Sequence, residues 1–371
     1  MQPVPRFIFY TGTDASVKSR LVQHGKILES KNPLEMLADA DVVVTDNTTK
    51  DEGFWIAQGT GIRNVPVLSL NHQQSGILES FKHPRLTRSS SEGIDAFFEK
   101  NPRPWTLYPT YFLCDAIDGA GKGTITAAVK DWGKFAARRI FDITHFSNTA
   151  NHIPTWSEVQ DLVASCDMLI MQEPSYSWLG AIIRNEIIKK DNPRKYSAVS
   201  TSMAYGLDRE LIFKRLAIPA LKEHKIVFAD RGRITSDTYQ PVQAELFEGY
   251  NREWFLSYVR GIPGNQVEES CVPGLLMVPV ISAEVTEERR KRREKDDNAI
   301  FETKDFQEEI AKIYAGDRIK RQYALRGTEV VDLNMSELKT PEDTKAFVRK
   351  VLFHYEENFW SADARVADRG I

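Results

Sequence analysis

The sequence predicts an α/β protein built from two tandem, doubly wound parallel-sheet domains, and three observations support this fold class. Short β-branched runs alternate with helical segments, which is typical of parallel strands joined by crossover helices. The pattern occurs twice, over residues 1–104 and 105–371, and a polar, Ser- and Pro-rich stretch at 82–110 puts the boundary near residue 105. The 371 residues are also too many for one ordinary domain and about right for two.

The first domain begins with a predicted strand at 6–13. A helical segment, PLEMLADA, leads to a second strand at 41–46, and a third follows at 65–71. These runs are short and rich in Val and Ile, as expected for buried parallel strands.

The second domain repeats this pattern on a larger scale. Its predicted strands are 110–117, 166–173, 225–231, 274–282 and 329–334. Helical patterns lie between them and after the last one, which favours a second doubly wound sheet.

Composition excludes several function classes. The formal net charge of −3 argues against a chain that coats nucleic acid by charge alone. Cys114, Cys166 and Cys271 are far apart and have no C-x-x-C spacing, so neither a disulfide framework nor a zinc site is expected. The apolar run near the N-terminus is too short for a signal peptide or a membrane span. We therefore expect a cytoplasmic protein with no membrane or nucleic-acid partner.

A glycine-rich segment, IDGAGKGT, follows the first strand of the second domain. The strand ends at Ile117 and a helix begins near Lys122, so backbone N–H groups and the helix N-terminus can surround a phosphate. Lys122 can then bridge the β- and γ-phosphates of a nucleoside triphosphate. The segment departs from G-x-x-x-x-G-K-[ST] at Ala116 and Gly123. A tight turn that needs glycine is the alternative interpretation.

The loop and four further segments together resemble the thymidylate kinase family of nucleoside monophosphate kinases. In chain order, the four segments are QEPSYSWLGAIIR, AYGLDRELI, FADRGRITSDTYQ and the helix NAIFETKDFQEEIAKIY. Their order and spacing agree with the family over about residues 108–360. The resemblance implies a P-loop kinase fold that takes ATP and Mg²⁺ and is usually a homodimer.

On the ATP side, the resemblance implies that the loop holds the donor. The expected ATP-binding residues are Gly119, Ala120, Gly121, Lys122, Gly123 and Thr124. Thr124, and Asp230 through water, are the expected magnesium contacts.

On the acceptor side, the resemblance implies that Arg231 binds the acceptor phosphate and that Asp118 contacts the acceptor sugar or phosphate. Arg209 would donate a hydrogen bond to the base, and Tyr205 would stack on a pyrimidine. The expected acceptor-binding residues are Glu173, Pro174, Tyr205, Arg209, Asp230, Arg231, Thr235 and Tyr239. Taken singly, an Asp-Arg pair at a strand end is usually a solvated ion pair, and a Tyr four residues before an Arg is usually one helix face.

The charged run TEERRKRREKDD at 286–297 is by itself most often a solvated helix surface. The resemblance implies instead a mobile lid whose arginines close over the transferring phosphoryl group and exclude water. The candidates are Arg289, Arg290, Arg292 and Arg293, and we assign the catalytic role to Arg290 and Arg293.

The N-terminal domain resembles the superfamily of nucleoside 2-deoxyribosyltransferases and deoxynucleoside-monophosphate N-glycosidases over residues 38–71. Its Asp51-Glu52-Gly53, Gly59 and Val-Pro-Val segments fall in register with that pattern. The family's nucleophile is a glutamate two residues before this glycine, but position 57 is Ala. A methyl group cannot attack a sugar, so we expect a non-catalytic domain used for regulation, dimerisation or substrate sensing.

The sequence thus predicts an ATP-dependent deoxynucleoside monophosphate kinase, most simply one that converts dTMP to dTDP. Departures from the family at Asp115-Ala116 and Gly232 lie around the acceptor pocket and leave the acceptor open. One alternative is a kinase for a modified or other deoxynucleoside monophosphate. The other is a nucleotide-binding regulator without catalysis.

Overall fold

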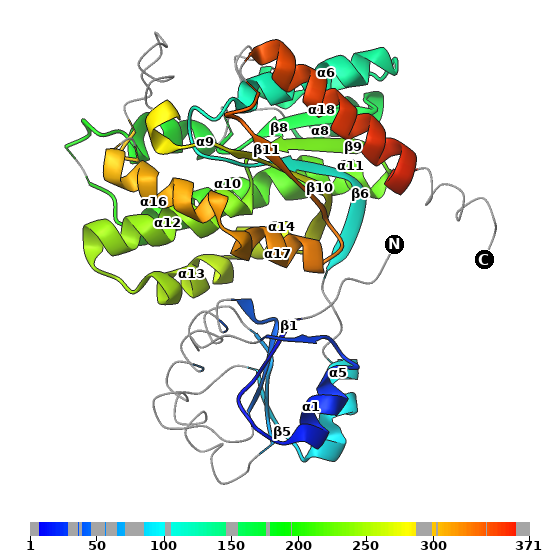
Figure 1. The fold of residues 1–371 in the computed structure, drawn as a ribbon, viewed down its shortest axis with the longest axis vertical. Coiled ribbons are helices and arrows are strands. Elements are labelled where there is room, and N and C mark those ends of the chain that lie inside the picture. The colour runs from blue at the N-terminus through cyan, green and yellow to red at the C-terminus, as the bar shows by residue number, and fades with distance from the viewer. Residues whose placement is uncertain are drawn as a thin grey trace.

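Two separate parallel sheets form the protein in the computed structural model, which confirms the predicted fold class (Figure 1). The structure describes residues 7–28, 36, 39–45, 56, 65–70, 85–100, 105–145, 155–175, 179–193, 195–286, 299–301, 303–338 and 340–360. The predicted boundary near residue 105 stays a prediction, because residues 101–104 lie outside these ranges.

The smaller sheet has five parallel strands in the order β2-β1-β3-β4-β5. They are β1 (Phe7–Tyr10), β2 (Lys26–Ile27), β3 (Val42–Thr45), β4 (Val67–Ser69) and β5 (Leu86–Arg88). Helices α1 (Ala15–Leu21) and α5 (Ile94–Lys100) cover one face, where Leu21 and Phe97 are buried against the strands (Figure 1). The other face has its own apolar cluster around Phe9 and Val43.

The larger sheet has six parallel strands in the order β11-β10-β6-β9-β8-β7. They are β6 (Thr106–Cys114), β7 (Ile140–Asp142), β8 (Met168–Gln172), β9 (Ile226–Asp230), β10 (Cys271–Val280) and β11 (Glu329–Asn334). The central strands β6, β8 and β9 are largely buried, which explains their continuous apolar sequences. Sequence patterns missed β2, β5 and β7, because strands of two or three residues carry too little periodicity to detect.

Helices cover both faces of the larger sheet (Figure 1). On one side, α6 (Lys122–Phe135) packs against α18 (Pro341–Tyr355). On the other side, α10 (Ala198–Ile212) packs against α12 (Arg233–Glu248) and α14 (Pro263–Glu269). The other α-helices in the described part of this domain are α8 (Trp156–Ser165), α9 (Leu179–Ile182), α11 (Ile218–Lys222), α13 (Arg252–Gly261), α16 (Lys304–Ala315) and α17 (Asp317–Leu325).

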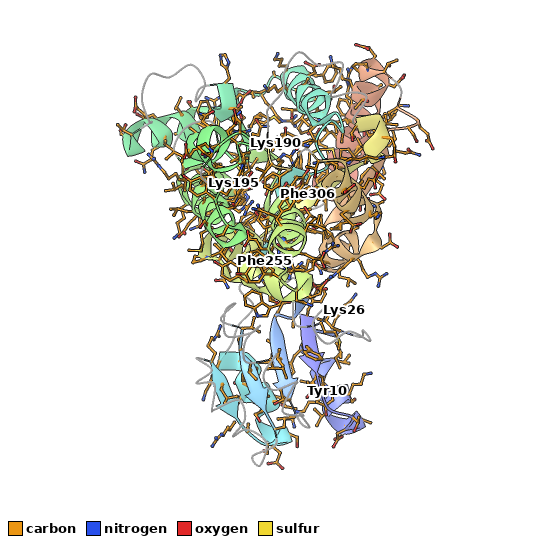
Figure 2. All side chains as sticks on the ribbon, turned by 90° about the vertical axis from the view of Figure 1, so that its left-hand side faces the viewer. Tyr10, Lys26, Lys190, Lys195, Phe255 and Phe306 are labelled. Carbon is orange, nitrogen blue, oxygen red and sulfur yellow. The ribbon has the colours of Figure 1, made fainter. Side chains whose placement is uncertain are left out.

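Ion pairs join the two domains. Asp39 lies 2.5 Å from Arg260 of α13 and 3.2 Å from Arg318 of α17. Asp41 lies 3.2 Å from Arg326, whose guanidinium also stacks over the ring of Phe7. Figure 2 shows α13, through its labelled Phe255, at the end of the larger domain that faces the smaller one. In the described part of the chain, Asp39 and Asp41 of the smaller domain therefore face arginines of the larger one.

None of the helices in the described part of the chain has the length and apolar character needed to cross a bilayer. The three cysteines are buried and form no disulfide.

Candidate active site

Three strand ends of the larger sheet meet at one edge. β6 pairs with β9 through Cys114 and Asp230, and β8 pairs with β9 through Gln172 and Asp230. After β6 the chain crosses to β7 at the far edge of the sheet, so the strand order changes direction beside β6. In α/β folds, ligands bind in the crevice that such a change leaves at the carboxyl ends of the strands. The residues that follow these three strands therefore lie side by side.

The glycine-rich loop after β6 runs directly into α6. Gly119 and Gly121 have φ angles of 83° and 94°, in the left-handed region that side chains rarely adopt. Lys122 is the first residue of α6 and is only 8% exposed. Its Nζ donates hydrogen bonds to the carbonyl oxygens of Ala116 (3.0 Å) and Ile117 (2.9 Å). Burial, and next the charge of Arg231, lower the pKa of Lys122.

Both departures from the usual loop pattern are accommodated without strain. The side chain of Ala116 is fully buried in the core of the domain, while its carbonyl oxygen faces Lys122 and Arg231. A Cβ atom on Gly123 would meet nothing within 4 Å, so glycine is not sterically required there. The loop geometry thus survives Ala at 116, and it would also admit the usual Ser or Thr at 123.

Arg231, directly after β9, lies against this loop. It has a φ of 75°, which is strained for a residue with a side chain. Its guanidinium forms an ion pair with Asp118, donates to the carbonyl oxygen of Ala116 (3.2 Å) and lies 5.7 Å from the ring centre of Tyr239. Burial alone would lower the pKa of Arg231, but Asp118 together with Tyr239, Asp115 and Tyr314 outweighs burial and holds this pKa well above its usual range. The structure therefore brings Lys122, Asp118 and Arg231 together.

Asp230 offers a buried carboxylate oxygen beside the loop. Its Oδ1 has no hydrogen-bond partner, and burial raises the pKa of the carboxyl group against the opposing charges of Lys122 and Arg231. Within the described residues, no group of three or more His, Cys, Asp or Glu side chains is arranged to hold a metal. An unpartnered carboxylate oxygen near this glycine-rich loop fits a hydrated Mg²⁺, which keeps several waters and takes its other ligands from phosphates.

Tyr205 of α10 is buried near the charges of Arg231 and Asp118. Burial raises the pKa of Tyr205 to about 12, and the charges of Arg184 and Arg231 act in the opposite direction. Arg184 also donates from Nε to the carbonyl oxygen of Pro174 (3.1 Å). Arg184 ends the segment QEPSYSWLGAIIR, which had no predicted role for this arginine. Its position makes it a further cation beside the predicted acceptor pocket.

Arg209 has a setting that its predicted role did not anticipate. It is 1% exposed, and its Nε and Nη2 lie 2.9 and 2.5 Å from Oε2 of Glu173. Its Nε also lies 2.8 Å from Oε2 of Glu268, and its Nη1 bonds to Ser236 (3.0 Å) and Asn265. A contact with an acceptor base would have to be made in addition to these bonds or in exchange for one of them. The predicted contact stays a prediction, and the observed role of Arg209 is to hold α10, α12 and α14 together.

Comparison with curated proteins finds similarity to two kinases. Thymidylate kinase of Prochlorococcus marinus (strain MIT 9515) is 29% identical over 160 residues, which are 43% of this chain and 72% of that protein. The chain is thus similar to thymidylate kinases. The probable thymidylate kinase of Methanoculleus marisnigri (strain ATCC 35101 / DSM 1498 / JR1) is 26% identical over 164 residues, or 44% of this chain and 75% of that protein. No family model matches the chain.

A solved structure of thymidylate kinase from Candida albicans superposes with a TM-score of 0.43 and 12% sequence identity. The match covers 67% of this chain and 92% of that one.

Several residues expected from the two resemblances lie outside the described residues. They are Arg289, Arg290, Arg292 and Arg293 of the predicted lid, and Asp51, Glu52, Gly53, Ala57 and Gly59 of the N-terminal domain. Conversely, Glu268 and Asn265 of α14 contact Arg209 but had no sequence signal, because PGNQVEES has the composition of a polar surface turn.

Proposed function

We propose that the larger domain transfers the γ-phosphoryl group of ATP to a deoxynucleoside monophosphate, with dTMP as the expected acceptor. The observation that carries this proposal is the meeting of Lys122 and Arg231 at the ends of neighbouring strands. One cation belongs to a glycine-rich loop suited to a triphosphate, and the other lies beside Tyr205 and Tyr239. Similarity to two thymidylate kinases supports dTMP as the acceptor.

The side chains of this site suit phosphoryl transfer, which depends on positioning and on charge neutralisation. The Nζ of Lys122 now donates hydrogen bonds to the carbonyl oxygens of Ala116 and Ile117. When ATP binds, this flexible side chain would donate to the β- and γ-phosphates instead. Arg231 would hold the acceptor phosphate while Asp118 fixes the orientation of its guanidinium. Tyr205 and Tyr239 would line the nucleoside pocket.

Magnesium, when bound, would neutralise negative charge on the phosphates of the nucleotide. Thr124 at the start of α6 and Asp230, through water, are the residues that would hold it. For Asp230, the support is its unpartnered Oδ1.

The test is an acceptor panel with a matched lysine control. Purified protein, ATP and Mg²⁺ are incubated with dTMP, dUMP, 5-hydroxymethyl-dUMP, dCMP, dGMP or AMP while ADP formation is followed. We expect turnover with dTMP, and Lys122→Ala should lower it by about 100- to 1,000-fold, as loss of one transition-state donor does. Lys130→Ala removes a lysine two turns further along α6, which is paired with Asp142, and should leave turnover unchanged. Absence of turnover with every acceptor would refute the kinase proposal.

For the N-terminal domain, we propose a deoxyribosyltransferase-like fold over residues 1–104 that has no glycosidase activity. Its five-stranded parallel sheet and the Ala at position 57 support this proposal. The ion pairs of Asp39 and Asp41 suggest that it serves the larger domain as a docked partner. Release of free base from any nucleotide of the same panel would contradict this proposal.

We also propose a cytoplasmic homodimer, with nucleotides as its ligands, in keeping with the thymidylate kinase resemblance. Sedimentation equilibrium tests the dimer, because a monomer mass at micromolar concentration would exclude it.

A further inference from the structure

A buried carboxylate directly follows strand β6. Asp115 is the first residue after the strand and is 0% exposed, and no ion pair of its carboxylate occurs in the described part of the chain. A charge in such a place is costly unless several donors satisfy it. Asp115 accepts hydrogen bonds from two backbone N–H groups and two hydroxyls, which belong to Gly232, Thr235 and Tyr314.

The two backbone donors lie just after the strained residue of the site. Oδ2 of Asp115 accepts from the N–H groups of Gly232 and Thr235, both at 3.0 Å. The preceding N–H, that of Arg231, donates to the carbonyl oxygen of Cys114 at 2.9 Å. The end of β6 therefore holds the backbone on both sides of the Arg231 Cα atom. This explains how an arginine stays at a φ of 75°, since strained conformations persist only where the surroundings over-determine them.

The side chain of Arg231 is held through a hydroxyl relay. Thr235 Oγ1 donates to Asp115 Oδ1 at 2.8 Å, and this leaves its lone pairs to accept from Arg231 Nη1 at 3.4 Å. Asp115 thus orients the hydroxyl that in turn orients the guanidinium. Asp115, which directly precedes the glycine-rich loop, thus contacts the backbone beside Arg231 and, through Thr235, adds to the hold of Asp118 on the guanidinium.

The fourth donor reaches the same carboxylate from α16. The hydroxyl of Tyr314 donates to Asp115 Oδ1 at 2.5 Å. This bond ties the helix to the junction of β6 and β9, and it stabilises the buried charge independently of the relay to Arg231.

We propose that Asp115 is a positioning residue for phosphoryl transfer, which fixes Arg231 relative to the glycine-rich loop through Gly232 and Thr235. This inference rests on the proposed function, because it presumes that Arg231 binds the acceptor phosphate. It assigns a role to a position where the sequence showed only a departure from a family pattern.

Two buried threonines of α12 provide the first test. Thr235→Val removes the relay hydroxyl and keeps the shape of the side chain. Thr238→Val makes the same change one turn further on, where the hydroxyl donates only to helix carbonyls of Ile234 and Thr235. We expect Thr235→Val to lower kcat/KM for the acceptor by about 10- to 100-fold, the range for hydrogen bonds to charged groups, with the Kd for ATP unchanged. Thr238→Val should stay within about twofold of the wild type, because its bonds serve only the helix.

Asp115→Asn provides the second test. An amide offers one acceptor oxygen in place of two, so either the backbone pair or the hydroxyl pair loses its acceptor. Asp115→Asn should lower kcat/KM by about as much as Thr235→Val does. The double variant should lose less than the product of the two single effects, because both substitutions act through one relay. Equal kcat/KM values for Asp115→Asn, Thr235→Val and Thr238→Val would overturn the proposal.

Amide hydrogen exchange separates this inference from the proposed function. In Asp115→Asn, the peptide that spans Arg231 to Thr235 should exchange faster than in the wild type, and in Thr238→Val it should not. This measurement needs no acceptor. Unchanged exchange would overturn the positioning role even in an active kinase. Faster exchange in a protein that turns over no monophosphate would refute only the proposed function.

Discussion

The buried arginine network around Arg209 makes a strong prediction about stability. Glu173 and Glu268 are both 3% exposed, and Arg209 is the cation that lies within 3 Å of each. Arg209→Met keeps much of the volume but leaves two buried carboxyl groups without that charge. Removing one partner of a buried ion pair costs about 3–5 kcal/mol.

This cost translates into a large change in melting temperature. For a domain of this size, 1 kcal/mol corresponds to about 2–4 °C, so we expect Arg209→Met to melt roughly 6–20 °C below the wild type. The loss should be larger at pH 9 than at pH 6, because the two carboxyl groups can take up protons at the lower pH. Differential scanning calorimetry at both pH values measures this.

Arg139→Met is the matched control. Arg139 also pairs with an acid, Asp167, but its side chain is 66% exposed. Exposed pairs contribute at most about 1 kcal/mol, so the melting temperature should fall by less than about 4 °C. If Arg209→Met melts no lower than Arg139→Met, the claim that Arg209 stabilises the packing of α10, α12 and α14 is wrong.

Two further predictions concern pH and the domain contact. Burial raises the pKa of Glu173 to about 8, so the folded protein keeps a proton that the unfolded chain releases. Stability should therefore fall between about pH 5 and pH 8, and Glu173→Gln should flatten this slope in melting curves; an unchanged slope would assign it to another group. Burial alone would raise the pKa of Asp39, but Arg260 and Arg318 outweigh burial and lower it. The contacts of Asp39 with Arg260 and Arg318 should therefore stabilise the fold at neutral pH, and this stabilisation should be lost as the pH falls through the lowered pKa of Asp39. In Asp39→Asn it should be absent at every pH. Asp95→Asn serves as the control, because Asp95 pairs with Arg20 within the smaller domain. Equal melting of the two variants at pH 7 would contradict a stabilising role of Asp39 in the contact between the domains.

The sequence alone determined the two parallel sheets and the segments that follow their strands. A buried strand can be predicted from consecutive apolar residues, as in IVFAD of β9. A phosphate-binding loop can be predicted from glycines next to a lysine. Such local patterns predicted that Lys122, Asp118 and Arg231 would lie at strand ends. The strand order then brought them together, because β6 and β9 are neighbours although more than 100 residues separate them.

Only the tertiary structure decided what the buried charges do. The bonds of Asp115 to Thr235 and Tyr314 span 120 and 199 residues, and the pair of Arg260 with Asp39 spans 221. Nothing in the residues around Asp115 or Arg209 records these partners, since a carboxylate or guanidinium has the same local sequence whether it faces solvent or another helix. Folding placed Arg209, whose base contact stays a prediction, at the centre of a network between helices, and it placed the carboxylate of Asp115 beside the backbone of Arg231 and Gly232. The sequence thus sets which charges are present, and folding decides which of them meet, because the free energy of a buried charge depends on the partners that surround it.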